Sequence, residues 1–281
     1  MNTAAPTANT RATVIRPSSG WFDLDLRSVW QYRELLFILA WRDVQLRYKQ
    51  AGLGIAWAII QPLFAVAIFT VIFGRFAKFP SGNVPYSVFA FAGILMFTYF
   101  SEATRRASAG LVTDAELIRK IYFPRLIMPL GAVVSPLIDF GFAFVVFLGL
   151  MFWFGVALTW KILLLPFVLI IAMMLALAMG LWLGPVNVRY RDVTHAIPFV
   201  LQVWMYASPI IYPLSIVPEK WQALYSLNPL VGIIEAFRWV TLDTPAPDFV
   251  SIGVSFVAIL VLLAGGLVYF RRRERGFADI I

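Results

Sequence analysis

Long uncharged runs dominate the chain after its first fifty residues, and short segments rich in charge separate them. Because a helix needs about 20 apolar residues to cross the hydrocarbon core of a bilayer, such runs predict transmembrane helices. Several runs are longer than a bilayer is thick, so we expect tilt, or kinks at Pro136 and Pro166, to absorb the excess. We place six spans, over residues 53–73, 79–101, 126–160, 162–188, 193–218 and 249–270. The predicted fold class is therefore an all-α polytopic membrane protein.

The composition supports a membrane protein and excludes several kinds of chemistry. Hydrophobic residues make up 61% of the chain and charged residues 14%, against about 25% charged residues in a soluble domain. Cysteine is absent and His195 is the only histidine, which argues against disulfides and against Cys- or His-ligated metal sites. The sequence motifs of phosphate-binding loops, serine hydrolases and zinc peptidases are also missing. We therefore assign no catalytic, metal-binding or cofactor-binding residue to this chain.

The distribution of positive charge predicts the orientation in the membrane. The net charge is +8, and 18 of the 23 Lys and Arg residues lie on one side if both termini share it. Cytoplasmic loops carry such an excess of Lys and Arg. We therefore expect both termini in the cytoplasm and interpret the charge as a topology signal, not as a nucleic-acid-binding surface.

The chain divides into four parts. Residues 1–27 are expected to be a cytoplasmic tail, 28–51 an amphipathic helix at the membrane interface, 52–270 the six-span domain and 271–281 a basic cytoplasmic tail. In the amphipathic helix, apolar residues recur at helical spacing and charges occupy the opposite face. This helix is either a basic membrane anchor or a contact with a soluble protein. Asp43 favours the protein contact, because a carboxylate does not help binding to anionic lipid.

The inside segment between the second and third spans, residues 102–125, contains a second candidate contact. Thr113 followed by Glu116 is the pattern of a capping box, which predicts the start of a short helix. Its apolar residues Leu117, Ile118 and Ile121 face an aqueous compartment. The helix is either a peg that inserts into a soluble partner or an element packed on its own bundle.

The outside segment between the last two spans is punctuated by prolines and still contains an uncharged stretch, residues 221–234. This stretch is too short to cross the bilayer twice and too apolar for a solvated loop. We expect two short re-entrant helices that break near Asn228 and Pro229 and form an outer gate; a hairpin lying on the surface is the alternative. The candidate gate residues are Pro213, Trp221, Asn228 and Pro229.

Asp139 lies about a dozen residues into the third span. A carboxylate at the bilayer centre costs roughly 2.5 to 3.5 kcal/mol on insertion scales, so it should face the bundle or a water-filled path. No Lys, Arg or His of the predicted spans is near it, which leaves two roles, cavity lining or a structural hydrogen bond. Aromatic residues of the fifth span, Trp204, Tyr206 and Tyr212, have apolar faces suited to stacking on sugar rings, although most membrane aromatics simply face lipid.

A stripe of small residues occupies every fourth position of the fourth span. Such a stripe allows close helix approach. We predict packing within the chain rather than a dimer face for Ala172, Ala176, Gly180 and Gly184.

Several ordered motifs resemble one known family. They are residues 41–57 with Gln61-Pro62, residues 117–125 with Met128-Pro129, and residues 187–192, 208–212 and 227–230. From about Trp30 to the C-terminus the chain resembles the membrane subunit of type 2 ABC exporters for cell-surface polysaccharides, the O-antigen and teichoic-acid exporter permeases.

This resemblance implies a homodimer of six-span subunits in the bacterial inner membrane. Each subunit would join one of two copies of a separate ATPase subunit, which binds ATP and Mg²⁺, and the complex would export a lipid-linked polysaccharide. The helix at 28–51 resembles the family's interface helix, and residues 213–240 its gate helices. A permease for a small lipid or drug is the alternative, and the sequence names neither the polymer nor the type of cell wall.

The resemblance also gives roles to individual residues. It implies a coupling helix that contacts the ATPase, with Asp114, Glu116, Leu117, Ile118, Arg119 and Ile121. A second hypothesis is that basic residues on the inner side bind the diphosphate of the lipid carrier, because Arg and Lys suit phosphate; they are Arg42, Arg47, Lys49, Arg189 and Arg191. Candidate residues lining the channel are Asp139, Trp204, Tyr206 and Tyr212.

Overall fold

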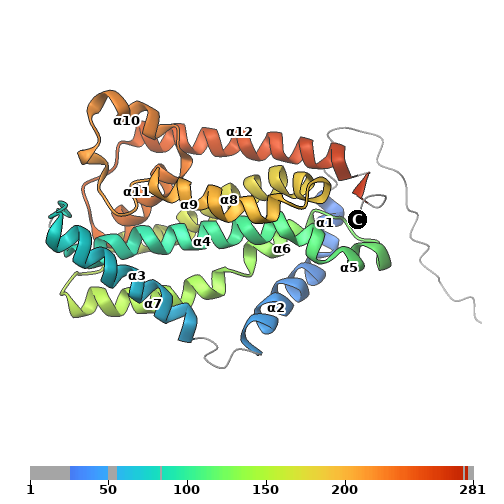
Figure 1. Ribbon diagram of the computed structural model, residues 1–281, viewed down its shortest axis with the longest axis horizontal. Coiled ribbons are helices and arrows are strands. Elements are labelled where there is room, and N and C mark those ends of the chain that lie inside the picture. The colour runs from blue at the N-terminus through green and yellow to red at the C-terminus, as the bar shows by residue number, and fades with distance from the viewer. Residues whose placement is uncertain (1–25, 50–55, 83, 275, 278–281) are drawn as a thin grey trace, which may run out of the picture.

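The computed structural model describes residues 26–49, 56–82, 84–274 and 276–277, and these residues form helices and turns without a strand. Most of the expected N-terminal tail and the last residues of the C-terminal tail lie outside the described residues. Three long helices, α4, α8 and α12, run side by side along the long axis (Figure 1). The helices in chain order are α1 (Leu26–Gln31), α2 (Arg33–Lys49), α3 (Ala56–Phe69), η1 (Thr70–Phe76), α4 (Tyr86–Thr113), α5 (Ala115–Lys120), α6 (Ile127–Val134), α7 (Leu137–Trp153), η2 (Trp160–Leu164), α8 (Leu165–Arg189), α9 (Val193–Tyr206), η3 (Leu214–Ile216), α10 (Glu219–Ser226), α11 (Pro229–Leu242) and α12 (Phe249–Glu274).

Five helical segments of the described chain are long and apolar enough to cross a membrane. Three of them combine neighbouring elements: α3 continues into η1, α6 continues into α7 past Pro136, and η2 continues into α8. Pro166 lies in the first turn of α8, where a missing N–H is tolerated, and so interrupts no backbone hydrogen bond inside that helix. The segments are Ile59–Phe76, Tyr86–Thr113, Ile127–Trp153, Trp160–Arg189 and Phe249–Glu274. The chain is thus a multi-pass, all-helical membrane protein.

The expected single helix over residues 193–218 is wrong. Helix α9 ends at Tyr206 after 14 residues, a length of about 21 Å, which is less than the roughly 30 Å of the hydrocarbon core. Pro209 and Pro213 follow, and neither can donate the backbone hydrogen bond that would continue the helix. A sixth crossing therefore stays a prediction.

The second helix also differs from its prediction, because α4 continues through Thr113 instead of ending near Ser101. Its added turns place Ala103, Ala107 and Leu111 at a spacing of four residues, and all three are buried. The expected inside loop is correspondingly shorter. Helix α4 is the centre of the bundle and packs against α8, α6, α11, α7 and α3.

The stripe of small residues on α8 packs within the chain, as predicted. Ala172 and Ala176 are fully buried. A Cβ atom on Gly180 would lie 2.4 Å from the Cβ of Ala107 on α4, so the two backbones approach as closely as glycine allows. This contact fixes the main packing of the bundle.

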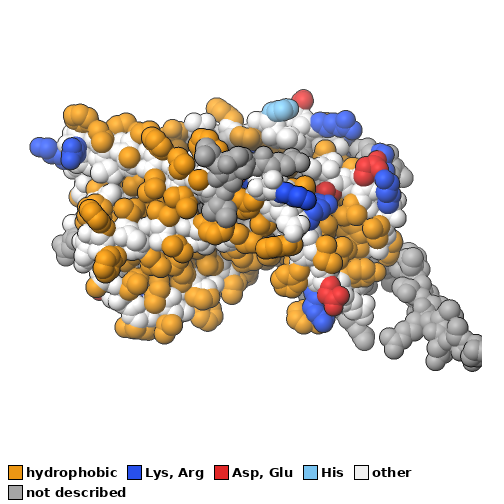
Figure 2. All heavy atoms as spheres, turned by 90° about the horizontal axis from the view of Figure 1, so that it is seen from below, with side chains coloured by type: hydrophobic (Ala, Val, Ile, Leu, Met, Phe, Trp, Pro, Cys, Tyr) orange, Lys and Arg blue, Asp and Glu red, His pale blue; other side chains and the backbone are white. Residues whose placement is uncertain are grey.

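The two ends of the bundle differ in composition. One end, called here the α5 end, carries α1, α2, α5 and the end of α12; the other, the α10 end, carries η1, α10, α11 and the start of α12 (Figure 1). Charged side chains gather at the α5 end, whereas most of the remaining surface in the same view is apolar (Figure 2). Helix α2 buries Leu39, Ala40 and Val44 and packs on α6, while Phe37 and Trp41 are exposed. The apolar residues of α2 therefore lie partly against α6 and partly on the outer surface of the chain.

Candidate functional site

At the α5 end, Arg42 links α2 to the junction of α4 and α5. Its Nη2 lies 2.8 and 2.9 Å from the two carboxylate oxygens of Asp114 and 3.1 Å from Asp43 Oδ1. Partial burial lowers the pKa of Arg42, but the hydrogen bonds to both carboxylates outweigh it and hold the pKa above its ordinary value. The carboxylates thus neutralise much of the charge that was expected to meet a lipid headgroup.

The expected capping box of the short helix is wrong. Thr113 is the last residue of α4, and Asp114 precedes α5 without a side-chain capping bond, because its carboxylate binds Arg42. Glu116 forms instead an ion pair with Lys120 at 2.9 Å and a longer one with Arg119 at 3.9 Å. Helix α5 is therefore tied to α2 at its start and carries exposed charge along its length.

The apolar residues of α5 and of the residues that follow it differ in burial. Leu117 and Ile118 are half-buried against a core cluster that includes Leu111. They contact the chain's own bundle, and their contact with a soluble partner stays a prediction. Ile121 and the adjacent Tyr122 are 51% and 69% exposed. The surface left for a partner at this end is centred on Ile121 and Tyr122.

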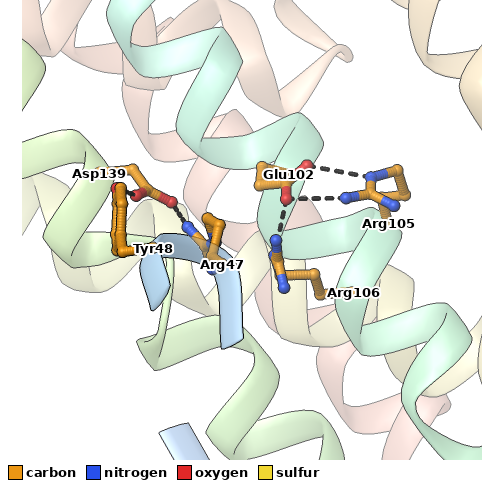
Figure 3. Close-up of polar contacts among 6 residues, drawn as sticks. All are labelled: Arg47, Tyr48, Glu102, Arg105, Arg106 and Asp139. Carbon is orange, nitrogen blue, oxygen red and sulfur yellow. Dashed lines mark hydrogen bonds and ion pairs between the residues drawn. The ribbon is translucent and has the colours of Figure 1, made fainter. Parts of the chain in front are cut away.

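Asp139 lies in the first turn of α7 and has two partners on α2. Arg47 forms an ion pair with one carboxylate oxygen, and the Tyr48 hydroxyl donates a hydrogen bond to the other (Figure 3). The Tyr48 ring also meets Phe142 edge-on, with 6.2 Å between the ring centroids. The cation beside Asp139 therefore comes from the expected interface helix and not from a predicted span.

A second charged group lies on α4, opposite the first. Glu102 accepts hydrogen bonds from Arg105 at 2.8 and 3.0 Å and from Arg106 at 2.6 Å. In Figure 3 Arg47 lies between Asp139 and this group. The end of α2 is thus surrounded by charges from both α4 and α7.

These two groups border a cavity of about 660 Å³ between α2, α3, α4 and α7. Asp139 is the one candidate channel residue that lines it, together with Arg47 among the candidate headgroup residues. Polar residues border one part, and apolar side chains such as Phe69, Ile94 and Ala143 border the rest. The volume is that of a typical small-molecule site.

The other three candidate headgroup residues are exposed at the same end. Lys49 ends α2, Arg189 ends α8 with its guanidinium 5.3 Å from the ring of Tyr190, and Arg191 follows in the turn to α9. The structure therefore divides the predicted set into two paired residues, Arg42 and Arg47, and three exposed ones.

Two of the candidate aromatic channel residues are held by hydrogen bonds near the end of α9. Trp204 packs edge-on against Phe100 and donates to Asn228 Oδ1 at 2.9 Å. The Tyr212 hydroxyl lies 2.9 Å from that of Tyr225, whereas Tyr206 is 57% exposed. None of the three lines the 660 Å³ cavity, and contact with a sugar chain stays a prediction for them.

Asn228 is the central residue of the expected gate. Its Oδ1 accepts from the backbone N–H of Leu230, which caps α11, and from Trp204. Its Nδ2 donates to Ser208 Oγ at 2.9 Å. The chain breaks between α10 and α11 at this residue, and Pro229 is the first residue of α11 and is buried. Of the other two gate residues, Pro213 precedes η3, and Trp221 on α10 is 49% exposed.

Arg238 is a functional candidate that the sequence analysis missed. Its side chain is 1% exposed, and its guanidinium donates to the carbonyl oxygens of Pro209 at 2.8 Å and Ile210 at 2.6 Å. It also lies 3.7 Å from the ring centroid of Phe89 on α4. A Cβ on Gly93 would come within 2.5 Å of the Ile210 carbonyl oxygen. Arg238 thus fastens the turn after α9 to α11 and α4.

One sequence signal pointed to this residue. Arg238 and Glu235 are the two charged residues of the otherwise uncharged run 229–242, and a cation in such a run requires internal acceptors. One acceptor, Glu235 three residues earlier, is visible in the sequence. The others are the backbone carbonyls of Pro209 and Ile210, which side-chain patterns do not encode. The Arg47–Asp139 pair had no comparable signal, because its members belong to different predicted parts of the chain.

The comparisons with known proteins agree with the fold and with each other. The family described as ABC-2 type transporter matches residues 34–242. The chain is 28% identical over 259 residues to the O-antigen export system permease protein RfbA of Myxococcus xanthus, covering 91% of this chain and 98% of that protein.

Two further relatives are similar in extent. The O-antigen export system permease protein RfbA of Klebsiella pneumoniae is 24% identical over 88% of this chain and 95% of its own length. The polysialic acid transport protein KpsM of Escherichia coli is 26% identical over 86% and 93%. Because the family match extends from α2 to the end of α11, it includes both ends of the bundle. The chain belongs to the membrane family of ABC-2 type transporters.

Proposed function

We propose that this chain is the transmembrane subunit of an ATP-driven exporter that moves a lipid-linked polysaccharide from the cytoplasmic to the outer side of the inner membrane. The observation that carries the proposal is the similarity, over nearly the whole chain, to permeases named for O-antigen export and for polysialic acid transport. The five apolar helical segments and the concentration of charge at one end of the bundle also support it.

In this proposal two copies of the chain form a homodimer and the polymer passes between them. The α5 end faces the cytoplasm with both termini, since the basic residues gather there. Helix α9 with residues 207–213 makes the sixth crossing, and α10 and α11 are the re-entrant outer gate. Trp204, Tyr206 and Tyr212 lie at the end of α9, where a sugar chain would leave the membrane.

Two copies of an ABC ATPase subunit, which bind ATP and Mg²⁺, contact the α5 end. The coupling surface comprises Ile121 and Tyr122, which are exposed, and the charged residues Glu116 and Arg119 around them. Leu117 and Ile118 support it from the core side, and Asp114 fixes its angle through Arg42.

A matched pair of variants tests this surface. Ile121→Asp should release the ATPase subunit during purification and abolish ATPase activity that depends on the complex, because a charge replaces an exposed apolar contact. Leu158→Asp is the control, because this residue is 52% exposed and lies in the turn between α7 and η2, outside the apolar segments; it should retain the ATPase. Full retention of the ATPase by Ile121→Asp would place the coupling surface elsewhere.

The diphosphate of the lipid carrier meets the exposed cations Lys49, Arg189 and Arg191 first. Arg42 and Arg47 contribute through the donors that their carboxylate partners leave available. Reversing the charge of Arg189 and Arg191 together should reduce export, and undiminished export would remove them from the pathway.

The decisive experiment for the function is depletion of this subunit in its own host. A glycan attached to its lipid carrier should accumulate on the cytoplasmic side, and the surface polymer should disappear. A permease for a small lipid or drug, the alternative, would leave the surface polymer and the carrier pool unchanged.

A further inference from the structure

Phe277 lies in the part of the chain that was expected to be a basic tail, yet it is 2% exposed. It follows the charged last turn of α12, at the α5 end of the bundle (Figure 1). There the Gly276 N–H donates to the Arg273 carbonyl oxygen at 3.0 Å, which closes a turn. The Phe277 ring meets Phe270 of α12 edge-on, with 5.6 Å between the ring centroids. Because burial of a phenylalanine ring is strongly favourable, this contact should hold the end of α12 in place.

The same ring lies against the segment that joins α5 to α6. The guanidinium carbon of Arg125 is 5.9 Å from the Phe277 ring centroid, and Arg125 Nη1 donates to the carbonyl oxygen of Glu274. The Glu274 carboxylate is itself paired with Arg271 at 3.2 Å. One buried cluster, called here the Phe277 cluster, contains Phe277 and Phe270 together with Leu39 of α2, Leu111 of α4, Phe123, Met128 of α6 and Val188 of α8. The end of α12 is thus joined to the chain directly after the coupling surface.

Helix α5 is too short to set its own position. It has six residues, none of which is fully buried, and isolated helices shorter than about 12–15 residues are marginal in water. Its start is tied to α2 by the Arg42–Asp114 pair, which is partly exposed. Its end continues into Phe123, which is 5% exposed and belongs to the Phe277 cluster. The coupling surface therefore lies between a partly exposed attachment and a buried one.

We propose that Phe277 and Arg125 are positioning residues for the coupling surface. They fix the end of α5 relative to α12, so that Ile121 and Tyr122 are presented in the orientation that the ATPase subunit binds. Without this attachment the surface would sample several orientations, and the apparent affinity would fall by the fraction that is competent. The inference rests on the proposed function for the identity of the partner, but not for the position of α5.

The test titrates the purified ATPase subunit against the full chain in nanodiscs and measures the stimulated ATPase activity. Phe277→Ala should raise the half-saturating concentration of the ATPase subunit about tenfold or more, the result when about a tenth of the surfaces are competent. The maximal rate should stay the same, because binding at saturation selects the competent orientation. A merely structural defect would instead lower the maximal rate and leave the half-saturating concentration unchanged.

A second pair of variants tests the attachment through the side chain of Arg125. Arg125→Leu removes the donor to the Glu274 carbonyl and should raise the half-saturating concentration as Phe277→Ala does. Arg125→Lys keeps a donor, because an ammonium group can reach the same oxygen, and should recover part of the affinity.

Phe147→Ala is the matched control for Phe277→Ala. It removes a ring that is equally buried, but this ring lies on α7 and packs against Phe91 and Phe237 in a different cluster. The half-saturating concentration should therefore match that of the parent. The proposal is overturned if Arg125→Leu binds as the parent does, or if Phe147→Ala weakens binding as much as Phe277→Ala.

A further measurement needs no ATPase subunit. The chain contains no cysteine, so spin labels on Tyr122→Cys and Tyr190→Cys report the distance between the coupling surface and the end of α8; both residues are exposed. In the full chain in nanodiscs this distance should be narrowly distributed. Phe277→Ala should broaden the distribution and Phe147→Ala should not, and an unchanged distribution in Phe277→Ala would contradict the proposal. Failure of the parent to bind any ABC ATPase subunit would count against the proposed function instead.

Discussion

The two ends of the bundle differ in how distant segments of the chain are joined. At each end, one arginine joins segments that are far apart in the sequence. Arg238 at the α10 end is 1% exposed and donates to two backbone carbonyls as well as to Glu235 on its own helix. The side chain of Arg42 at the α5 end is 35% exposed and pairs with carboxylates. A carbonyl oxygen is fixed by the backbone, but a carboxylate can rotate, hydrate or exchange partners.

The two kinds of contact differ in energy, so the two ends should differ in rigidity. Removing a partner from a buried ionic contact typically costs about 3–5 kcal/mol, while a half-exposed ion pair contributes about 0–1 kcal/mol. Contacts at the α10 end therefore hold one arrangement, and those at the α5 end allow several of nearly equal energy. An end that must respond to a soluble partner benefits from the second kind.

The largest expected effect belongs to Arg238. Arg238→Leu should lower the free energy of unfolding by about 3–5 kcal/mol, because the carbonyls of Pro209 and Ile210 lose their donors in a nonpolar environment. Thermal unfolding of the purified protein in detergent measures it, with Arg33→Leu on the exposed face of α2 as control. A loss below about 1 kcal/mol would show that the two ends do not differ as described.

Asn228 should have the next largest effect. Asn228→Ala removes the cap of α11 and the acceptor for Trp204 and should destabilise the corner by about 1–2 kcal/mol. Hydrogen exchange at the Leu230 and Val231 amides detects this locally. Asn228→Ser keeps a capping oxygen and should recover part of the protection; equal exchange in both variants would mean that the cap is irrelevant.

The Arg42–Asp114 pair should be weaker. A double-mutant cycle with Arg42→Gln and Asp114→Asn should give a coupling energy of at most about 1 kcal/mol, and added salt should reduce it. Glu116 and Lys120, which are 72% and 73% exposed, form the reference pair, for which we expect about 0.3–0.5 kcal/mol. A coupling energy of several kcal/mol would make the α5 end as rigid as the α10 end.

The smallest effect is expected for an exposed contact at the α10 end, which tests whether burial or the end of the bundle determines the strength of a contact. Asp248, fully exposed at the α10 end, accepts from the Ser251 hydroxyl and the Val250 N–H at the start of α12. The hydrogen bond from Ser251 holds the pKa of this carboxyl below its ordinary value. Its small stabilisation should be complete above the ordinary pKa and disappear as the pH falls through the folded-state pKa.

Hydrogen exchange at the start of α12 between pH 5 and 3 measures this change. Asp248→Asn retains a capping oxygen and should be insensitive to pH over that range. If the parent were equally insensitive, the carboxylate would contribute nothing to the start of α12.

The sequence predicted the elements better than their ends. Hydropathy placed the five long helical segments, because each must bury or expose an apolar surface over a bilayer's thickness. It failed at the end of α4, where Glu102, Arg105 and Arg106 reduced hydropathy although Ala103, Ala107 and Leu111 still followed a helical spacing. The helical period was the better guide there than the mean hydropathy.

The polar contacts were the least predictable part. Asp139 was recognised as a residue in need of a partner, but Arg47 lies on a helix outside the predicted spans, and no local pattern connects the two. For Asn228 the position at a helix start was visible, whereas its bonds to Trp204 and Ser208 depend on the turn at Pro209. Contacts of this kind follow from the tertiary packing.

The partners of Asp139 also bear on how the protein is made. Arg47 and Tyr48 precede Asp139 by about ninety residues, so the ribosome completes α2 well before α7 leaves it. The cation and the hydroxyl that pair with Asp139 are then synthesised before the carboxylate is. The unfavourable insertion of a lone acidic residue is thereby avoided by the order of synthesis.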